Sequence, residues 1–177
     1  MTDDQMYRSY LAGDLTAGDQ LMLLYADALT AYLDGFLHNA HDAEDLMLDC
    51  FTVILVDKPR IAQGNFRAYL YRVARNMAVR LRKRREFCLD ETLLAGESSP
   101  EDAALASEHS AAVRRCLNRI APQYREALWL VYDTGLSYAQ AAKVLRCGTK
   151  KIDNLLTNGK KQLRQELEKE GITNAHG

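Results

Sequence analysis

Apolar residues recur along this chain at steps of three and four, the spacing that places side chains on one face of an α-helix. The segment 21–36 shows the pattern clearly, with apolar residues at Leu21, Leu24, Tyr25, Ala28, Tyr32 and Phe36. No run alternates apolar and polar residues cleanly enough to predict a β-strand. The chain is therefore predicted to be all-α.

Capping residues and helix breakers divide the first half of the chain into four predicted helices. They cover residues 3–12, about 16–36, 42–56 and 66–85. The signals are a stop at Gly13, a cap at Thr16, a breaker at Pro59 and a cap at Asn65.

The middle of the chain is predicted to be a linker. Residues 86–99 combine acids with a Gly-Glu-Ser-Ser-Pro run and show little periodicity. Ser99 as a cap, Pro100 behind it and two acids then predict a new helix start, and Pro122 opens a later helix. We therefore expect two small helical domains, 1–86 and 109–177, joined by an acidic linker at 87–108.

The end of the chain has the plan of a helix-turn-helix. Ser137 and Gln140 form a capping box before a short helix to residue 145, and a three-residue turn leads to a long helix over about 149–169. The small Ala142 suits a close helix crossing. The long helix carries residues able to meet phosphates or base edges in a major groove: Lys150, Lys151, Asn154, Thr157, Asn158, Lys160 and Lys161. An ordinary α-hairpin with a solvated basic face is the alternative.

The predicted helix 66–85 is strongly basic and rich in aromatics. Its apolar stripe is predicted to be Phe66, Tyr69, Leu70, Val73, Met77 and Leu81. The opposite side would carry Arg72, Arg75, Asn76, Arg82 and Lys83. Basic side chains interleaved with Phe66, Tyr69 and Tyr71 suit melted nucleic acid, with cations on phosphates and rings near bases. The alternative is that the aromatics are core and the last cations form a solvated helix end.

A third segment of interest is the acidic helix start at 42–51. Glu44 and Asp45 are expected to be solvated acids of the first turn, and Leu46, Cys50 and Phe51 to be mostly core. The functional alternative is a protein-docking face whose carboxylates meet basic residues of a partner.

Charge is strongly segregated, although the formal net charge is only −1. Residues 1–57 hold eleven acids and one base, and residues 58–85 hold ten bases and no acid. Residues 86–112 hold seven acids and no base, and residues 113–177 hold twelve bases and six acids. Such blocks indicate surfaces with opposite roles, because like charges kept together cost folding free energy.

Other classes of protein are disfavoured. No apolar stretch is long enough to span a membrane, and the N-terminal residues lack the basic region of a secretory signal. The four cysteines, scattered without a CxxC pair, fit a cytosolic chain with reduced thiols. The four histidines form no zinc pattern, and the nucleotide-binding and hydrolase motifs are absent. We expect no cofactor, no metal and no catalytic residue, so an enzyme is the weaker class.

Two blocks of residues, one in each predicted domain, match a known pattern. The first is Asp42-Ala43-Glu44-Asp45-Leu46 with Phe51, followed by the run from Asn65 to Asn76 and then by an Arg/Lys run. The second joins the segment around Pro122 to the run Gly135-Leu-Ser-Tyr-Ala-Gln-Ala-Ala142. In this order they resemble regions 2 and 4 of extracytoplasmic-function RNA polymerase sigma factors, over nearly the whole chain.

The resemblance implies that the chain binds core RNA polymerase, places it at a promoter and opens the −10 element. Polymerase docking would fall to Asp45, Leu46, Leu48, Asp49 and Phe51. The basic helix and the loop before it would melt and read the −10 region, with Asn76 lining the pocket for a flipped base and Arg72, Arg75, Arg80, Arg82 and Lys83 holding the backbone. The −35 readers would be Asp153, Asn154, Thr157 and Asn158, with Lys150, Lys151 and Lys160 on phosphates.

The resemblance also gives the charge blocks a meaning. The acidic first helices would face polymerase, the two basic blocks would face DNA, and the acidic linker would lie in the nucleic-acid channel. An anti-sigma factor is a further implied partner, and the chain would work in the cytoplasm without entering a membrane.

Five positions depart from the family pattern. Leu48 replaces the usual Gln of the docking helix, Tyr69 replaces a Trp, and Arg146 stands where the turn usually has Gly. Asp153 and Asn158 stand where many relatives carry Lys or Arg. A carboxylate near phosphates weakens binding, whereas Asp can accept from cytosine and Asn can pair with adenine. Either a different −35 sequence or weak −35 binding would follow.

Two other functions stay open at this point. A stand-alone helix-turn-helix regulator would bind duplex DNA tightly as a dimer on a palindrome, without polymerase. A polymerase-docking adaptor would co-purify with polymerase but make no salt-dependent promoter contact.

Overall fold

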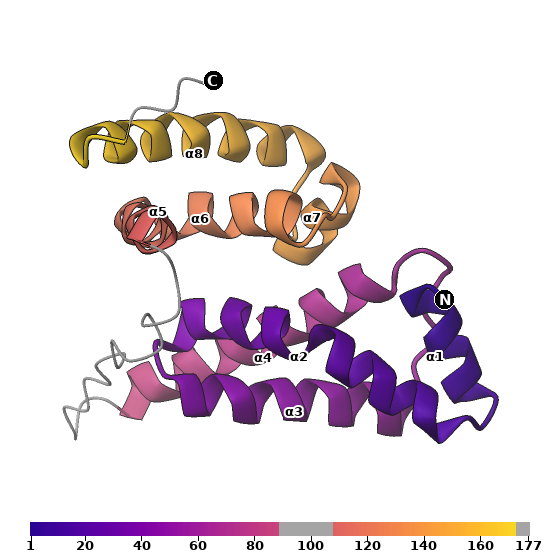
Figure 1. Ribbon diagram of the computed structural model, residues 1–177. Coiled ribbons are helices and arrows are strands. Elements are labelled where there is room, and N and C mark those ends of the chain that lie inside the picture. Colours follow the sequence, from indigo (N-terminus) through magenta and orange to yellow (C-terminus); the bar gives the residue numbers. More distant parts are fainter. Residues whose placement is uncertain (89–107, 173–177) are drawn as a thin grey trace. The chain divides into compact units, whose positions relative to one another are not determined.

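The computed structural model describes residues 1–88 and 108–172 and divides the chain into two compact units, 1–98 and 99–177. Every regular element among the described residues is helical, which confirms the all-α prediction. Each unit is described by itself below and is shown in Figure 1. Residues 86–88 of the predicted linker belong to the fourth helix, and the linker residues 89–107 lie outside the described residues together with the helix start at Ser99.

The first unit consists of α1 (Asp3–Leu11), α2 (Leu15–Leu37), α3 (Ala40–Asp57) and α4 (Phe66–Cys88). In Figure 1, α1 crosses one end of the unit beside the loop that leads into α4, and the three longer helices pack along one another. The fourth helix begins at the predicted residue and continues three residues beyond the predicted end.

Two predicted helix starts in this unit are corrected by their caps. The cap of α2 is Asp14, whose carboxylate accepts from the main-chain N–H of Thr16 and from its hydroxyl, so Thr16 lies inside the helix. The cap of α3 is Asn39, whose side chain accepts from the N–H of Asp42 at 3.1 Å. An Asp or Asn cap satisfies one of the N–H groups that a helix start leaves unpaired, which moves both starts toward the N-terminus.

The buried face of α4 differs from the predicted stripe. Its buried residues are Phe66, Ala68, Leu70, Tyr71, Ala74 and Ala78, whereas Tyr69, Val73 and Met77 are only half-buried. The helix contacts α1, α2 and α3, so its buried arc is broad, and small alanines allow close packing along it. The sequence prediction was based on the larger apolar residues and missed the alanines. The predicted buried face is therefore rotated around the helix axis relative to the observed one.

The second unit consists of α5 (Glu108–Arg119), α6 (Pro122–Leu128), the π-helical turn η2 (Trp129–Asp133), α7 (Tyr138–Leu145) and α8 (Thr149–Lys169). The predicted capping box is present, since Ser137 accepts from the N–H of Gln140 while the Gln140 side chain accepts from that of Ser137. Pro122 is the first residue of α6, as predicted.

Helices α7 and α8 form the predicted helix-turn-helix. Val144 and Ile152 are fully buried, and Ala142 and Leu156 are buried beside them. Arg146 adopts the left-handed conformation, with φ 55°, at the position where a glycine is usual, and the N–H groups of Arg146 and Cys147 both donate to the carbonyl of Ala142. This conformation costs a non-glycine residue roughly 1–2 kcal/mol, so the turn is kept by its hydrogen bonds and by helix packing.

A glycine sets how closely α8 approaches α6. A Cβ atom added at Gly159 would lie 3.1 Å from the Cβ of Tyr124 and 3.2 Å from a methyl carbon of Leu128. Such distances are shorter than ordinary van der Waals contact, so Gly159 allows the long helix to pack directly on α6. The packing fixes which face of α8 is left outward.

Candidate nucleic-acid interface

The outward face of α4 carries a narrow polar stripe. At about 100° per residue, Tyr69, Arg72, Asn76 and Lys83 follow one another along this stripe, and Arg80 lies beside it. Arg72 and Lys83 are exposed, while Asn76 is half-buried. Two of the predicted DNA contacts, Arg75 and Arg82, lie about a quarter of a turn away from the centre.

Of the aromatic residues predicted to interleave with these cations, only Tyr69 belongs to the stripe. Phe66 and Tyr71 are each 1% exposed, and the Tyr71 ring packs edge-on to Tyr32 with centroids 5.1 Å apart. They are core residues, which corrects the hypothesis that they stack on nucleic acid. The guanidinium of Arg72 lies 5.1 Å from the centroid of the Tyr69 ring. This pair presents a cation and a ring together, the combination that suits an unpaired base beside its phosphate.

The end of α4 is tied to the start of α3. Arg85 donates to a carboxylate oxygen of Asp42 at 2.8 Å, and both side chains are partly exposed. The basic block is therefore not uniformly available, because Arg85 already has an acidic partner within the unit. Arg72 and Lys83 on the outward stripe remain exposed.

The predicted docking helix α3 presents only part of the predicted set. Asp45 and Asp49 are exposed and Leu48 is 47% exposed, whereas Leu46 and Phe51 are buried. Leu46 and Phe51 are core residues, as the first interpretation of this segment predicted, and they do not lie on its outward face. Their burial favours that interpretation over the docking assignment for these two residues.

Two residues extend the α3 face beyond the predicted ones. Val53 and Val56 are exposed on the same helix, Val56 by 71%, and they follow Leu48 and Asp49 at helical steps. The sequence could have indicated these two valines, because they recur at helical spacing on the side of the helix that carries the acids. The outward face of α3 thus combines carboxylates with exposed apolar side chains, a composition suited to a protein partner.

The outward face of α8 is centred on four residues. Because Ile152, Leu155, Leu156 and Gly159 face inward, the opposite side is formed at helical spacing by Lys150, Asn154, Thr157 and Lys161. All four are exposed. Asp153 and Lys160 lie on one flank of this stripe, and Lys151 and Asn158 lie on the other.

Lys160 has a contact inside its own unit. Its ammonium group lies 4.7 Å from the centroid of the Tyr132 ring, and a hydrogen bond with the Tyr132 side chain raises the pKa of Lys160. Asp153 lies on the same flank, seven residues or about two helical turns before Lys160, and its charge also raises the pKa of Lys160. The acid that departs from the family pattern is therefore beside the central stripe and close to a basic side chain.

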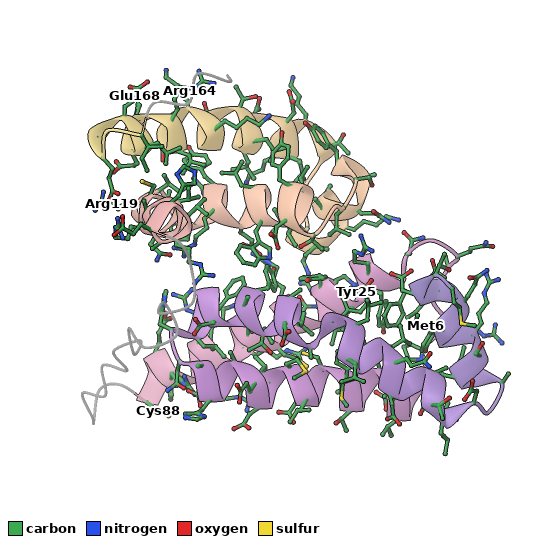
Figure 2. All side chains as sticks on the ribbon, in the orientation of Figure 1. Met6, Tyr25, Cys88, Arg119, Arg164 and Glu168 are labelled. Carbon is green, nitrogen blue, oxygen red and sulfur yellow. The ribbon has the colours of Figure 1, made fainter. Side chains whose placement is uncertain are left out.

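Ion pairs hold the C-terminal end of α8 on α5. Arg115 donates to Glu170 at 3.1 Å, and Arg119 lies 3.0 Å from Glu170 and 3.8 Å from Glu166. Figure 2 shows Arg119 on the α5 side, while Arg164 and Glu168 point away from α5 and α6. Sequence reasoning missed this clasp, which fixes the orientation of the outward stripe along the helix.

Neither a metal-binding cluster nor a membrane-spanning helix is found among the described residues. No group of three or more His, Cys, Asp or Glu side chains within 1–88 and 108–172 is arranged to hold a metal ion. None of the helices in those ranges is long and apolar enough to cross a membrane.

Two family models match this chain. The model for sigma-70 region 2 matches residues 21–87, and the model for sigma-70 region 4 matches residues 110–163. The first match contains α3 and most of α4, and the second contains the helix-turn-helix up to the middle of α8.

Two curated sigma factors are similar to most of this chain. The chain is 32% identical over 165 residues to the RNA polymerase sigma-H factor of Pseudomonas aeruginosa, covering 82% of this chain and 83% of that protein. It is 25% identical over 171 residues to the ECF RNA polymerase sigma factor SigW of Bacillus subtilis, covering 88% and 91% of the two chains.

Solved structures share the fold. The sigma factor RpoE of Bartonella quintana, in complex with the anti-sigma factor NepR, matches with a TM-score of 0.67 at 24% identity and covers 85% of this chain and 96% of its own. CnrH, in complex with the cytosolic domain of CnrY, matches with a TM-score of 0.66 at 23% identity and covers 94% and 97%.

Proposed function

Because this chain belongs to the extracytoplasmic-function sigma factors of the sigma-70 family, and is therefore an alternative sigma factor that directs transcription initiation, we propose how its residues divide that work. Core RNA polymerase and promoter DNA are its partners. We assign polymerase docking and −10 opening to residues 1–86, −35 recognition to residues 109–177, and the connection to the linker 87–108.

The outward stripe of α4 is the observation that carries the proposal. Asn76 lines the pocket for the flipped −10 base, and the Arg72–Tyr69 pair holds the base and its phosphate from the preceding turn. Lys83 and Arg80 contact the backbone further along the helix. Arg75 and Arg82 add charge from the flank, where they attract DNA without reading it.

We propose that the loop 58–65 before α4 reads the −10 element together with this stripe. The loop holds Lys58 and Arg60, both exposed, and leads directly into the first turn of α4. It ends at the N-terminus of α4, about three helical turns before Asn76 on the same helix.

The −35 element is read by the centre of the α8 stripe. Asn154 is able to pair with the edge of adenine, and Thr157 lies one turn later on the same face. Lys150, Lys151 and Lys161 neutralise phosphates on either side, while Lys160 is oriented by Tyr132. Asp153 and Asn158, on opposite flanks, reach base edges only at the margins of the site.

Docking on polymerase falls to the outward face of α3. Asp45 and Asp49 meet basic residues of the polymerase, and Leu48 contributes an apolar contact where relatives have a Gln. We add Val53 and Val56 to this face because they are exposed along the same side.

Regulation and location follow from the same assignment. The solved relative RpoE is bound by an anti-sigma factor, and we propose that this chain is held inactive by such a partner in the cytoplasm. We assign no catalytic residue, cofactor or metal to it, because RNA synthesis belongs to the polymerase.

Transcription from a genomic fragment library tests the function. Purified core enzyme with this chain should produce transcripts whose start sites share upstream elements, whereas core enzyme alone should not. Absence of any chain-dependent start site would contradict the proposal. A gel shift of duplex DNA by the chain alone would favour the stand-alone regulator, and co-purification without promoter contact would favour the adaptor.

A further inference from the structure

Helix α1 lies outside the segment that the region 2 family model matches, which begins at residue 21. It nevertheless makes several side-chain hydrogen bonds with the rest of its unit. A capping box between Thr2 and Gln5 fixes its first turn. Its polar side chains converge on the loop 58–65 and on the two helix ends that the loop connects.

Two of these contacts hold the loop itself. The hydroxyl of Tyr7 donates to the main-chain carbonyl of Pro59 at 2.7 Å, near the start of the loop. The main-chain N–H of Gly64 donates to the carboxylate of Asp4 at 2.9 Å, near its end. Burial raises the pKa of Tyr7 to about 12, so its hydroxyl remains a donor at neutral pH. The two hydrogen bonds thus attach the loop to α1 near both of its ends.

Other contacts fix α1 against the flanking helices. The hydroxyl of Tyr10 donates at 2.7 Å to the carbonyl of Leu55, one of the four carbonyls that the end of α3 leaves without a helical partner. The hydroxyl of Tyr25 donates to Asp3 and accepts from Arg67 in the first turn of α4. Figure 2 shows Tyr25 on the side of the unit where α1 packs. Helix α1 is therefore a rigid support rather than a loose terminus.

We propose that α1 is a positioning element for promoter opening, which holds the loop 58–65 in its DNA-reading conformation through Tyr7 and Asp4. The proposal rests on the proposed role of this loop at the −10 element. A loop that is already ordered loses less conformational entropy when it binds the melted strand, so opening is faster. Neither residue contacts DNA, and both act through the main chain of the loop.

The chain supplies a matched pair of variants. Tyr7→Phe and Tyr10→Phe each remove one hydroxyl from the same helix, and each breaks one 2.7 Å bond to a carbonyl. Only the Tyr7 hydrogen bond ends in the loop; the Tyr10 ring, whose centroid lies 5.4 Å from the Lys58 ammonium group, is kept in Tyr10→Phe. A role in folding alone makes the two variants alike, whereas a role in positioning separates them.

The first measurement is hydrogen exchange in the free full-length chain. The variant Tyr7→Phe should speed exchange of peptides covering 58–65 by about three- to tenfold, since one lost bond changes the opening equilibrium by a factor of this order, and the double variant that adds Asp4→Ala should speed it further. Tyr10→Phe should leave the exchange of that loop near wild type. Equal loop exchange in the two variants overturns the proposal.

The second measurement is open-complex formation by the holoenzyme at a promoter that the wild-type chain uses. The double variant should open duplex promoter about three- to tenfold more slowly, bind core enzyme like wild type, and recover on a template melted in advance at −10. Tyr10→Phe should open duplex promoter at nearly the wild-type rate. An unchanged rate in the double variant, or no recovery on the melted template, overturns the proposal. A wild-type holoenzyme that opens no promoter would contradict the proposed function itself.

Discussion

The base-reading role proposed above rests on single side chains of two helices. Asn76 and Asn154 stand at the centres of the outward stripes of α4 and α8, each flanked at helical spacing by cations. An amide side chain offers a donor and an acceptor at once, which suits a base edge, whereas the neighbouring Lys and Arg residues suit phosphates. Specificity is therefore expected from the amides and affinity from the cations.

The substitution Asn76→Ala tests the first of these amides. We expect a loss of about 1–3 kcal/mol of base recognition, seen as a slowing of about ten- to a hundredfold in promoter opening measured by permanganate reactivity of unpaired thymines. Binding to core enzyme should remain unchanged, because Asn76 lies on α4 and the docking face lies on α3. Loss of core binding in this variant would show that the faces are wrongly assigned.

The substitution Asp153→Lys tests the flank of the α8 stripe. Replacing an anion by a cation near phosphates should strengthen promoter binding and steepen its salt dependence by about one unit of slope. Glu168→Lys makes the same change of charge on the same helix, near its C-terminal end, and should have a smaller effect. Equal slopes for the two variants would mean that this part of α8 does not approach DNA.

At the scale of the helices, close packing at a few small residues decides how the elements meet. A Cβ at Gly18 of α2 would lie 2.8 Å from a ring carbon of Tyr10, whose hydroxyl is fixed on α3. A Cβ at Gly35 of the same helix would meet nothing within 4 Å. The two glycines of α2 therefore have opposite roles.

Alanine at these two positions gives opposite shifts in stability. Gly18→Ala should lower the free energy of unfolding by about 1–3 kcal/mol through overpacking. Gly35→Ala should raise it by about 0.4–1 kcal/mol, because alanine restricts the unfolded chain. Urea unfolding followed by far-ultraviolet circular dichroism measures both, and shifts of the same sign would contradict the packing described for α1 on α2.

The clasp between α5 and the end of α8 depends on pH. Hydrogen bonding from Arg115, together with the charge of Arg119, lowers the pKa of Glu170 below its ordinary value of 4.5. The clasp therefore stabilises the folded unit fully above pH 4.5 and loses its effect as the pH falls through the folded-state pKa.

Trp129, the single tryptophan, lies in this unit and reports its unfolding. The variant Glu170→Gln should lower the urea midpoint of Trp129 fluorescence at neutral pH. The difference from wild type should shrink as the pH falls below 4.5. A difference that stays constant with pH would exclude an ionic contribution from Glu170.

Helix limits were largely predictable from the sequence because caps and breakers are local. Pro122 and the Ser137–Gln140 box begin their helices as expected. The buried and exposed faces of each helix were harder to predict, since they depend on which other helices pack against it. Tyr71 was assigned to a functional face, and for Phe51 both a core and a docking position were considered. Both residues are core, because α4 contacts three helices and α3 packs against α2 and α4. The contact of Lys160 with Tyr132 joins residues far apart in sequence, and no local pattern indicates it.

At the scale of the whole molecule, the charge blocks correspond to separate faces. The acids of residues 1–57 include Asp45 and Asp49 on the outward side of α3, and the bases of 58–85 include the outward stripe of α4. The second basic block supplies the stripe of α8. A net charge of −1 thus conceals surfaces of opposite sign within one chain, which is the arrangement expected of a protein that binds both a protein partner and DNA.

Transcription from a library with randomised upstream DNA tests the central claim most directly, because it reports polymerase activity and both promoter elements together. The holoenzyme should enrich two separated elements. Asn154→Ala should alter only the upstream one, and Asn76→Ala should weaken use of the downstream one. If no element is enriched over core enzyme alone, or if either substitution changes the opposite element, the assignment of α4 to the −10 region and α8 to the −35 region is wrong.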